Sequence, residues 1–410
     1  MNCLSILAIL LGGWCIPTQA AEWRSVPGHI KTQFGETVSP ENAWREYPRP
    51  QMVRTEWQSL NGLWDYAIVG RDEPWTNGYV ENALFDPLAK SLPNPPTSWD
   101  GKILVPFCPE SALSGVGRLV RPNQLLWYRR TFVVPPSWSG QRLLLHFEAV
   151  DWHLVVRLNG VEVGDHKVGN VPVACDLTHA LHPSGPQEIT VAVWDPTNVG
   201  DQAVGKQALP EQKKGYRYTP TTGIWQSVWL EPVAATSLEQ LRLMPDVDGE
   251  KQIAQASGDP GQRLSLPLPH PKLWRPDLPF LYDLKVVLTR GRRKLDEVAS
   301  YCGMRKIAVR ADARGIPRIH LNNQPIFQFG PLDQGYWPES LLTPPSDAPG
   351  RRFAGGGRWL CLGQARAVAG PVPAGGGAHA TPRNPCRLCR GATRSVNQRR
   401  RSVRPRGRSL

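Results

Sequence analysis

Short runs of alternating apolar and polar residues, separated by turn residues, dominate the chain from about residue 103 to residue 230. A period of two places every second side chain on one face, which is typical of a half-buried β-strand. Asn159-Gly160 lies between two such runs, and this dipeptide accepts the positive φ angles of a type I′ hairpin turn. Many short strands without a helical repeat predict a β-sandwich or jelly roll. The predicted strands are residues 125–134, 143–147, 152–158, 161–163, 187–194 and 224–230.

A second and smaller β unit follows residue 232, with predicted strands at 238–243, 282–289 and 295–305. An immunoglobulin-like sandwich usually takes about 100 residues, and this unit offers only about 75, so we expect a shortened sandwich of that kind. Residues 316–329 then predict a strand, a turn and an apolar strand. An apolar strand followed by a polar loop is how a β/α barrel presents a binding residue at the carboxyl end of a strand.

Charge is distributed unevenly along the chain. Segment 349–410 holds 14 of the 48 Lys and Arg residues, all of them Arg, and no Asp or Glu. The rest of the chain therefore has 34 basic residues and all 35 acidic residues, which nearly balance. The net charge of +13 therefore belongs to this segment, and the remaining chain lacks the positive excess that nucleic-acid binding requires.

The basic segment itself has two interpretations. An Arg/Gly-rich tail can neutralise phosphates, whereas translation of a GC-rich gene in the wrong frame also enriches Arg, Gly, Ala and Pro and removes Lys. We favour the second interpretation. We therefore expect a disordered tail and no nucleic-acid partner.

Residues 1–20 begin with an apolar run and end in small residues, which predicts a secretory leader and a secreted or periplasmic protein. A buried N-terminal segment is the alternative. No later run reaches the roughly 18 apolar residues of a membrane-spanning helix, so no membrane span is expected. Cys108, Cys175 and Cys302 cannot all pair and are predicted to be small buried apolar residues. The nine His show no metal-ligand clustering and no phosphate-binding glycine loop is present, so we predict neither a metal nor a cofactor. The oligomeric state is left open.

Six blocks follow one another over residues 61–232: Asn61-Gly62-Leu63-Trp64, Val105-Pro106-Phe107-Cys108-Pro109-Glu110-Ser111, Trp127-Tyr128-Arg129-Arg130-Thr131-Phe132, Phe147-Glu148-Ala149-Val150-Asp151-Trp152, Leu158-Asn159-Gly160 and Thr222-Gly223-Ile224-Trp225-Gln226. In order and spacing they resemble the N-terminal sugar-binding domain of glycoside hydrolase family 2, the family of bacterial β-galactosidases and β-glucuronidases. Each block alone is weakly specific, and their order carries the resemblance.

The resemblance implies three modules in sequence: a jelly roll, an immunoglobulin-like sandwich and a catalytic (β/α)₈ barrel. We therefore predict a sugar-binding jelly roll over residues 21–234, a partial immunoglobulin-like sandwich over 235–308, the start of a truncated barrel over 309–348 and the tail over 349–410. A complete barrel needs about 250 residues, so we expect it to be absent.

The expected activity follows from the missing barrel. Family 2 enzymes resemble retaining glycosidases, which need two carboxylates about 5 Å apart. The resemblance places the acid/base in an Asn-Glu dipeptide, and this chain contains none. We predict no catalytic residue and an inactive N-terminal fragment of a secreted glycoside hydrolase. The alternative is a non-catalytic carbohydrate-binding protein.

Four polar residues are predicted to contact a carbohydrate. The resemblance places Asp333 and Gln334 in the loop after the first barrel strand, where a carboxylate can accept two charge-assisted hydrogen bonds from sugar hydroxyls. Asp201 and Gln207 lie in a loop similar to the one that reaches toward the barrel mouth. A solvated loop residue is the alternative for all four. Three tryptophans are predicted to be core residues and not sugar-stacking ones: Trp152, Trp194 and Trp225.

Overall fold

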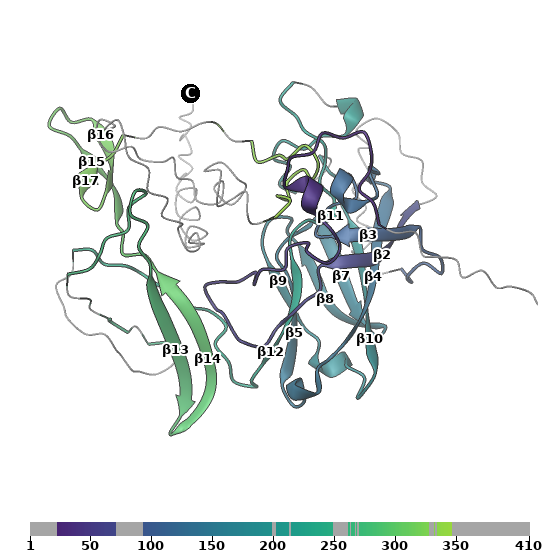
Figure 1. The fold of residues 1–410 in the computed structure, drawn as a ribbon, viewed down its shortest axis with the longest axis horizontal. Helices are drawn as coiled ribbons and strands as arrows, with labels where there is room; N and C mark the ends of the chain where they lie inside the picture. Colours follow the sequence, from purple (N-terminus) through teal and green to yellow (C-terminus); the bar gives the residue numbers. More distant parts are fainter. Residues whose placement is uncertain are drawn as a thin grey trace, which may run out of the picture.

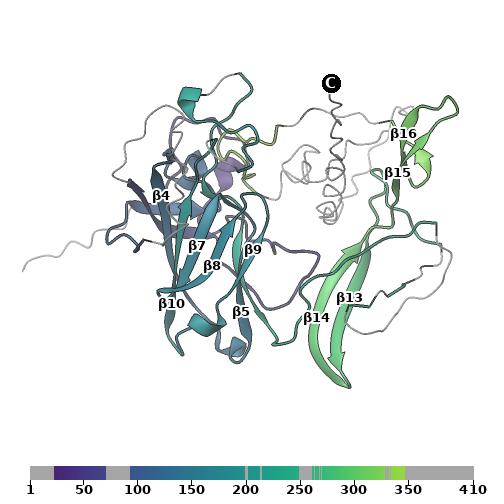
Figure 2. The same ribbon diagram turned by 180° about the vertical axis from the view of Figure 1, so that it is seen from behind.

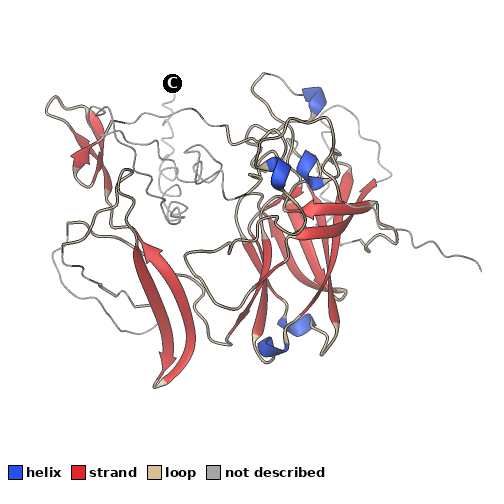
Figure 3. Cartoon of the chain, in the orientation of Figure 1, coloured by secondary structure: helices blue, strands red, loops and turns tan. Residues whose placement is uncertain are grey.

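The computed structural model describes residues 23–70, 93–198, 202–212, 215–248, 261–262, 264–266, 268, 270–327, 332 and 334–346. Strands dominate these ranges, and the helices in them are short 3₁₀ turns (Figure 3). The prediction of a mainly β protein is confirmed. None of the helices in the described ranges is long and apolar enough to cross a membrane. The predicted leader and the Arg-rich tail lie outside the described residues, so export and tail disorder stay predictions.

Two antiparallel sheets form a β-sandwich (Figures 1 and 2). The six-stranded sheet has the order β3-β2-β4-β10-β7-β8, and the four-stranded sheet has the order β1-β12-β5-β9. Neighbouring strands are often far apart in sequence, as in jelly-roll connections. The first sheet contains β2 (Gly62–Gly70), β3 (Gly101–Val105), β4 (Gln124–Val133), β7 (His153–Leu158), β8 (Val161–Lys167) and β10 (Pro186–Trp194). The second contains β1 (Gln58–Ser59), β5 (Arg142–Phe147), β9 (Val173–Asp176) and β12 (Val228–Val233).

Shorter elements complete the sandwich. A two-stranded sheet joins β6 and β11. The 3₁₀ helices lie in the connections between strands. The bounds are β6 (Val150–Asp151), β11 (Gly223–Ile224), η1 (Gly35–Thr37), η2 (Ala112–Ser114), η3 (Pro136–Trp138), η4 (Thr178–Ala180) and η5 (Pro210–Gln212).

The core of the sandwich follows from the alternation along its strands. On β4, Leu126, Tyr128 and Phe132 belong to the main core cluster. Leu125 and Trp127 of the same strand belong to a smaller cluster on the opposite face of the six-stranded sheet. Because fully burying a large apolar side chain contributes roughly 1.5–3 kcal/mol, this two-sided burial of β4 stabilises the six-stranded sheet.

The predicted hairpin is confirmed. Asn159 and Gly160 connect β7 to β8 with φ angles of 51° and 83°. The Asn159 side chain also donates hydrogen bonds to the Ala180 carbonyl at 2.9 Å and to Gln187 Oε1 at 2.8 Å. The turn is therefore held by its backbone preference and by contacts to two other segments.

The predicted strand 224–230 is two strands in the structure. β11 pairs with β6 and β12 pairs with β5, so the chain passes from one sheet to another at residues 225–227. Apolar residues flank Gln226 and Ser227 on both sides, so the local pattern does not mark this change of partner. Trp194 is buried as predicted, whereas Trp152 and Trp225 are only half-buried.

The second β unit contains β13 (Tyr282–Arg290) and β14 (Arg293–Cys302), which form a two-stranded sheet beside the sandwich (Figure 1). The predicted strand 238–243 is wrong, since these residues form no strand. The physical reason is that side chains bind the backbone of this segment. The Leu238 N–H donates to Asp296 Oδ2 at 2.7 Å, and its carbonyl accepts from Arg54 Nη2 at 2.8 Å.

Arg54 connects the sandwich to this unit. Its buried guanidinium donates to Glu231 Oε2 on β12 at 3.0 Å and to Asp296 Oδ2 on β14 at 2.8 Å. Val53, next to it, forms an isolated β-bridge with Ala299 of β14. We call Arg54, Glu231 and Asp296 the buried ion network.

A third sheet consists of β15 (Ile307–Ala311), β16 (Pro317–Leu321) and β17 (Gln324–Pro325) in antiparallel order. The predicted turn at Asn322-Asn323 is present, with φ angles of 50° and 67°. The apolar strand expected to follow is limited to the two residues of β17, and residues 328–331 lie outside the described ranges.

Residues 334–346 return to the sandwich. The Leu113 N–H donates to the Glu339 carbonyl at 3.0 Å, Trp44 Nε1 donates to the Pro344 carbonyl at 2.8 Å, and Thr343 Oγ1 donates to the Trp225 carbonyl at 2.7 Å. The segment is therefore attached to the end of the sandwich where β3 and β11 terminate.

Candidate functional site

Three carboxylic acids from separate elements meet at this end of the sandwich. Glu110 follows β3, Asp151 ends β6 and Asp195 follows β10. They are 9%, 4% and 1% exposed, respectively, and each lies close enough to another to affect its ionisation. We call these three residues the carboxylate cluster. In the described part of the chain no Lys or Arg forms an ion pair with any of them.

Neutral donors hold the cluster. Asp195 Oδ1 accepts from the Thr197 N–H at 2.6 Å, and its Oδ2 accepts from Thr222 Oγ1 at 2.7 Å. Glu110 Oε2 accepts from the Thr222 N–H at 3.2 Å, and its Oε1 accepts from the Val120 N–H at 3.3 Å. The Thr222 residue therefore bridges two of the three acids.

Gln207 orients the third acid. Its Nε2 donates to Asp151 Oδ2 at 2.9 Å, and its Oε1 accepts from the Thr221 N–H at 2.6 Å. Asp151 Oδ1 has no protein donor among the described residues. This oxygen can therefore accept a hydrogen bond from a ligand hydroxyl without losing a protein contact.

Burial without a cation favours the protonated acids. Burial raises the pKa of Glu110 to about 8 and that of Asp195 to about 6. Burial, with added repulsion from Asp195 and Glu110, raises the pKa of Asp151 well above its ordinary value. A protonated carboxyl can donate as well as accept a hydrogen bond, which suits recognition of a hydroxyl.

Aromatic residues lie around Asp151. Tyr218 and Tyr336 stack with ring centroids 4.4 Å apart and an interplanar angle of 20°. Burial, with added repulsion from nearby groups that include Asp151, raises the pKa of Tyr336 to about 12. Trp225 Nε1 donates to the Gly169 carbonyl at 2.8 Å. Polar oxygens beside aromatic rings are the usual composition of a sugar site, because the apolar faces of a sugar pack on rings.

Gly169 is pressed against Asp151. A Cβ at position 169 would lie 2.4 Å from Asp151 Oδ1. We expect Gly169→Ala to displace this carboxyl and to lower the free energy of unfolding by about 1–3 kcal/mol. Urea denaturation measures this change. Gly70→Ala is the matched control, since a Cβ there meets nothing within 4 Å, and equal effects of the two substitutions would contradict the packing argument.

The comparison with known proteins identifies the family. Residues 57–231 match the family described as "Glycosyl hydrolases family 2, sugar binding domain", and residues 235–305 match "Glycosyl hydrolases family 2". The chain belongs to glycosyl hydrolase family 2. The resemblance of the sequence blocks is thereby confirmed, and the carboxylate cluster lies within the part that matches the sugar-binding domain.

The relatives within family 2 are longer than this chain. A β-glucuronidase of Paenibacillus borealis is 25% identical over 299 residues, which are 64% of this chain and 47% of the relative. A β-galactosidase of Thermoanaerobacter pseudethanolicus is 23% identical over 235 residues, which are 49% of this chain and 30% of the relative. The chain thus spans about half, or less, of the curated relatives it matches.

A solved structure shares the fold. The β-glucuronidase from Ruminococcus gnavus in complex with D-glucaro 1,5-lactone has a TM-score of 0.50 and 18% identity. The match covers 74% of this chain and 54% of the other. The arrangement of β units is therefore one already seen in a family 2 enzyme.

The four predicted site residues have different outcomes. Gln207 lies in the site and holds Asp151. Gln334 accepts a hydrogen bond from Lys206 Nζ, which brings the returning segment next to the Gln207 loop. Asp201 and Asp333 lie outside the described residues. Sugar contact by any of the four stays a prediction.

Sequence reasoning missed Glu110, Asp151 and Asp195 as site residues. Glu110 and Asp151 stand inside two of the matching blocks, and this position was the signal that could have found them. Asp195 was only the first residue of the predicted loop. In the described ranges no group of three or more His, Cys, Asp or Glu is arranged to hold a metal ion.

Proposed function

We propose that this chain is the sugar-binding part of a secreted family 2 glycoside hydrolase and that it binds β-glucuronide- or β-galactoside-like sugars at Asp151. The observation that carries the proposal is the Asp151 carboxyl, fixed by Gln207 through one oxygen and without a protein donor among the described residues at the other, beside the Tyr218–Tyr336 pair. The naming of its relatives as β-glucuronidase and β-galactosidase supports the class of sugar.

We also propose that the 410-residue polypeptide does not cleave glycosides by itself. It contains no Asn-Glu dipeptide, in which family resemblance places the acid/base. Both carboxyl oxygens of Glu110 and of Asp195 accept hydrogen bonds from protein donors, so neither residue offers a free oxygen for catalysis. Retaining hydrolysis needs two carboxylates that both reach the anomeric carbon region.

Calorimetric titration with galactose, together with nitrophenyl β-galactoside and β-glucuronide as substrates, tests both parts. We expect saturable binding of galactose by the full chain and no release of nitrophenol. Asp151→Asn should weaken binding roughly tenfold, because its amide oxygen must face the Gln207 donor and its NH₂ group then replaces the oxygen that would accept from a sugar hydroxyl. Asp176→Asn, at a half-exposed site on β9, is the control and should bind as the unmodified chain does.

The outcomes separate the two parts. Turnover of either nitrophenyl glycoside would overturn the proposed lack of hydrolysis and leave sugar binding intact. Equal binding by the Asp151→Asn and Asp176→Asn variants would overturn the assignment of the site. A lasting absence of galactose binding would overturn the proposed function as a whole.

A further inference from the structure

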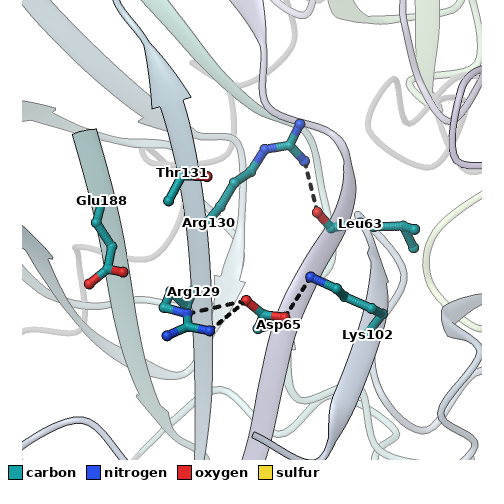
Figure 4. Close-up of a pocket in the computed structure, with 7 residues that line it drawn as sticks. All are labelled: Leu63, Asp65, Lys102, Arg129, Arg130, Thr131 and Glu188. Carbon is teal, nitrogen blue, oxygen red and sulfur yellow. Dashed lines mark hydrogen bonds and ion pairs between the residues drawn. The ribbon is translucent and has the colours of Figure 1, made fainter. Parts of the chain in front are cut away.

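A polar pocket lies on the outer face of the six-stranded sheet (Figure 4). Its volume of about 400 Å³ fits a sugar unit, since small-molecule sites usually measure about 300–1,000 Å³. It lies far from the carboxylate cluster, because Glu188 and Asp195 are near opposite ends of β10, about 23 Å apart at the rise of a strand. The lining residues are Leu63, Asp65, Lys102, Arg129, Arg130, Thr131 and Glu188.

Strand register builds the pocket. Asp65 of β2 is the register partner of both Lys102 on β3 and Arg129 on β4, and Glu188 on β10 is the partner of Thr131 on β4. Register partners of an antiparallel pair lie on the same face of the sheet. The face is the outer one, because the flanking residues on β2 and β4 enter the core.

Arg129 is held in place before any ligand binds. Its Nε and Nη2 both donate to Asp65 Oδ2 at 3.1 Å, and Lys102 Nζ lies 2.6 Å from Asp65 Oδ1. The guanidinium carbon also lies 4.6 Å from the centre of the Trp99 ring. A guanidinium fixed on two sides loses little conformational entropy when it binds an anion. Nη1 of Arg129 is bound to no protein acceptor in the described residues.

Arg130 lies beside the pocket but on the core side of β4, since its register partner Ile189 belongs to the main core cluster. Its Nη1 donates to the Leu63 carbonyl at 3.2 Å. The guanidinium groups of Arg130 and Arg45 both approach Gly62, where a Cβ would lie 3.4 and 3.6 Å from them. Burial, with repulsion from Arg45, lowers the pKa of Arg130 to about 10. The charge of Arg130 therefore lies on the core side of the sheet, and Arg129 and Lys102 supply the cations of the outer pocket.

Glu188 places a negative charge on the side of the pocket opposite the cations. It is exposed, and its carboxylate has no partner among the described residues (Figure 4). A bare inorganic anion gains nothing from it, because two negative charges repel. A ligand complementary to the whole pocket carries a carboxylate for the cations and hydroxyl donors for Glu188.

We propose that this pocket is a second carbohydrate site, which binds the carboxylate of a uronic acid unit through Arg129 and Lys102 and its hydroxyls through Glu188. The site is separate from the proposed one at Asp151. It requires a carboxylate on the sugar, whereas galactose, which has none, reports on the Asp151 end alone. Titration with galactose therefore tests the site at Asp151 alone, and the loss of either site can be detected independently of the other.

Calorimetric titration of the full chain with glucuronate, glucose and inorganic sulfate tests the proposal. We expect glucuronate to bind, glucose to bind at least tenfold more weakly at this site, and Arg129→Gln and Glu188→Gln each to lower glucuronate affinity roughly tenfold. Galactose titrations should not change in either variant. Arg142→Gln is the matched control, since Arg142 pairs with Asp176 on the other sheet and its side chain is 36% exposed, as is that of Arg129.

Three results would overturn the site. One is glucuronate binding that Arg129→Gln and Glu188→Gln leave unchanged. Another is sulfate binding as tight as glucuronate binding and insensitive to Glu188→Gln, which would indicate a simple anion site. The third is the absence of glucuronate binding by the unmodified chain. Glu188 is exposed, so its variant remains a valid test if the Arg129 variant fails to fold.

Discussion

Replacing Arg54 by alanine is expected to lower the free energy of unfolding by about 3–5 kcal/mol, because the change leaves the buried Asp296 without its cation and removes one of the basic partners of the buried Glu231. The Arg54 side chain is 8% exposed, and those of Glu231 and Asp296 are 0% and 7% exposed. Burial alone would raise the pKa of Glu231, but His146 and Arg54 outweigh it and hold the pKa below its ordinary value. Removing Arg54 takes away part of that compensation.

Urea denaturation of the full chain measures this effect. Arg142→Ala is the control, since it removes a half-exposed ion pair with Asp176 that should contribute no more than about 1 kcal/mol. Arg54→Lys should fall between the two, because lysine keeps the charge but cannot bind Glu231, Asp296 and the Leu238 carbonyl together. Equal midpoints for Arg54→Ala and Arg142→Ala would contradict the role of the buried ion network.

The buried ion network also shows where the local pattern of apolar and polar residues fails to predict a strand correctly. The strands β4, β5 and β10 could be predicted, because each has one face in the core and alternation records that burial. Residues 238–243 also mix leucines with polar residues, yet the backbone of Leu238 is bound by Arg54 and Asp296. Those partners lie far away in sequence, so no local signal could reveal that side chains replace a neighbouring strand.

The site was predictable only in part for a similar reason. Gln207 could be proposed from the loop that contains it. The acids Glu110, Asp151 and Asp195 follow one another at intervals of 41 and 44 residues, and only the sheet topology brings them together. A sequence block can show that a residue belongs to a family motif. It does not show that three acids are buried close together without a cation to pair with them.

That environment has a consequence for stability. A buried acid whose pKa is raised in the folded protein binds its proton more tightly there than in the unfolded chain. Its contribution is therefore fully present below the unfolded pKa and is lost as pH rises through the folded pKa. For Glu110 the window runs from 4.5 to about 8, and for Asp195 from 3.8 to about 6. The buried ion network acts in the opposite sense, since the pKa values of Glu231 and Asp296 are lowered.

We therefore expect stability to fall by about 2–3 kcal/mol between about pH 6 and about pH 9 from Glu110 alone, at 1.36 kcal/mol per unit of pKa shift. Urea denaturation at both pH values measures the fall. Glu110→Gln should remove most of this pH dependence, because an amide does not ionise. The variant should also be less stable near pH 6, since its amide nitrogen faces an N–H donor where a carboxyl oxygen accepted one.

The slope with pH, and not the absolute stability, is the decisive quantity. Glu188→Gln removes a carboxyl that is exposed, so it controls for the loss of one charge and should keep the slope of the unmodified chain. A Glu110→Gln variant that loses as much stability between the two pH values as the unmodified protein would contradict protonation of Glu110. Such a result would mean that another group causes the loss of stability at alkaline pH. Asp151 would be the next acid to replace, because it is also buried and is repelled by the charges of Asp195 and Glu110.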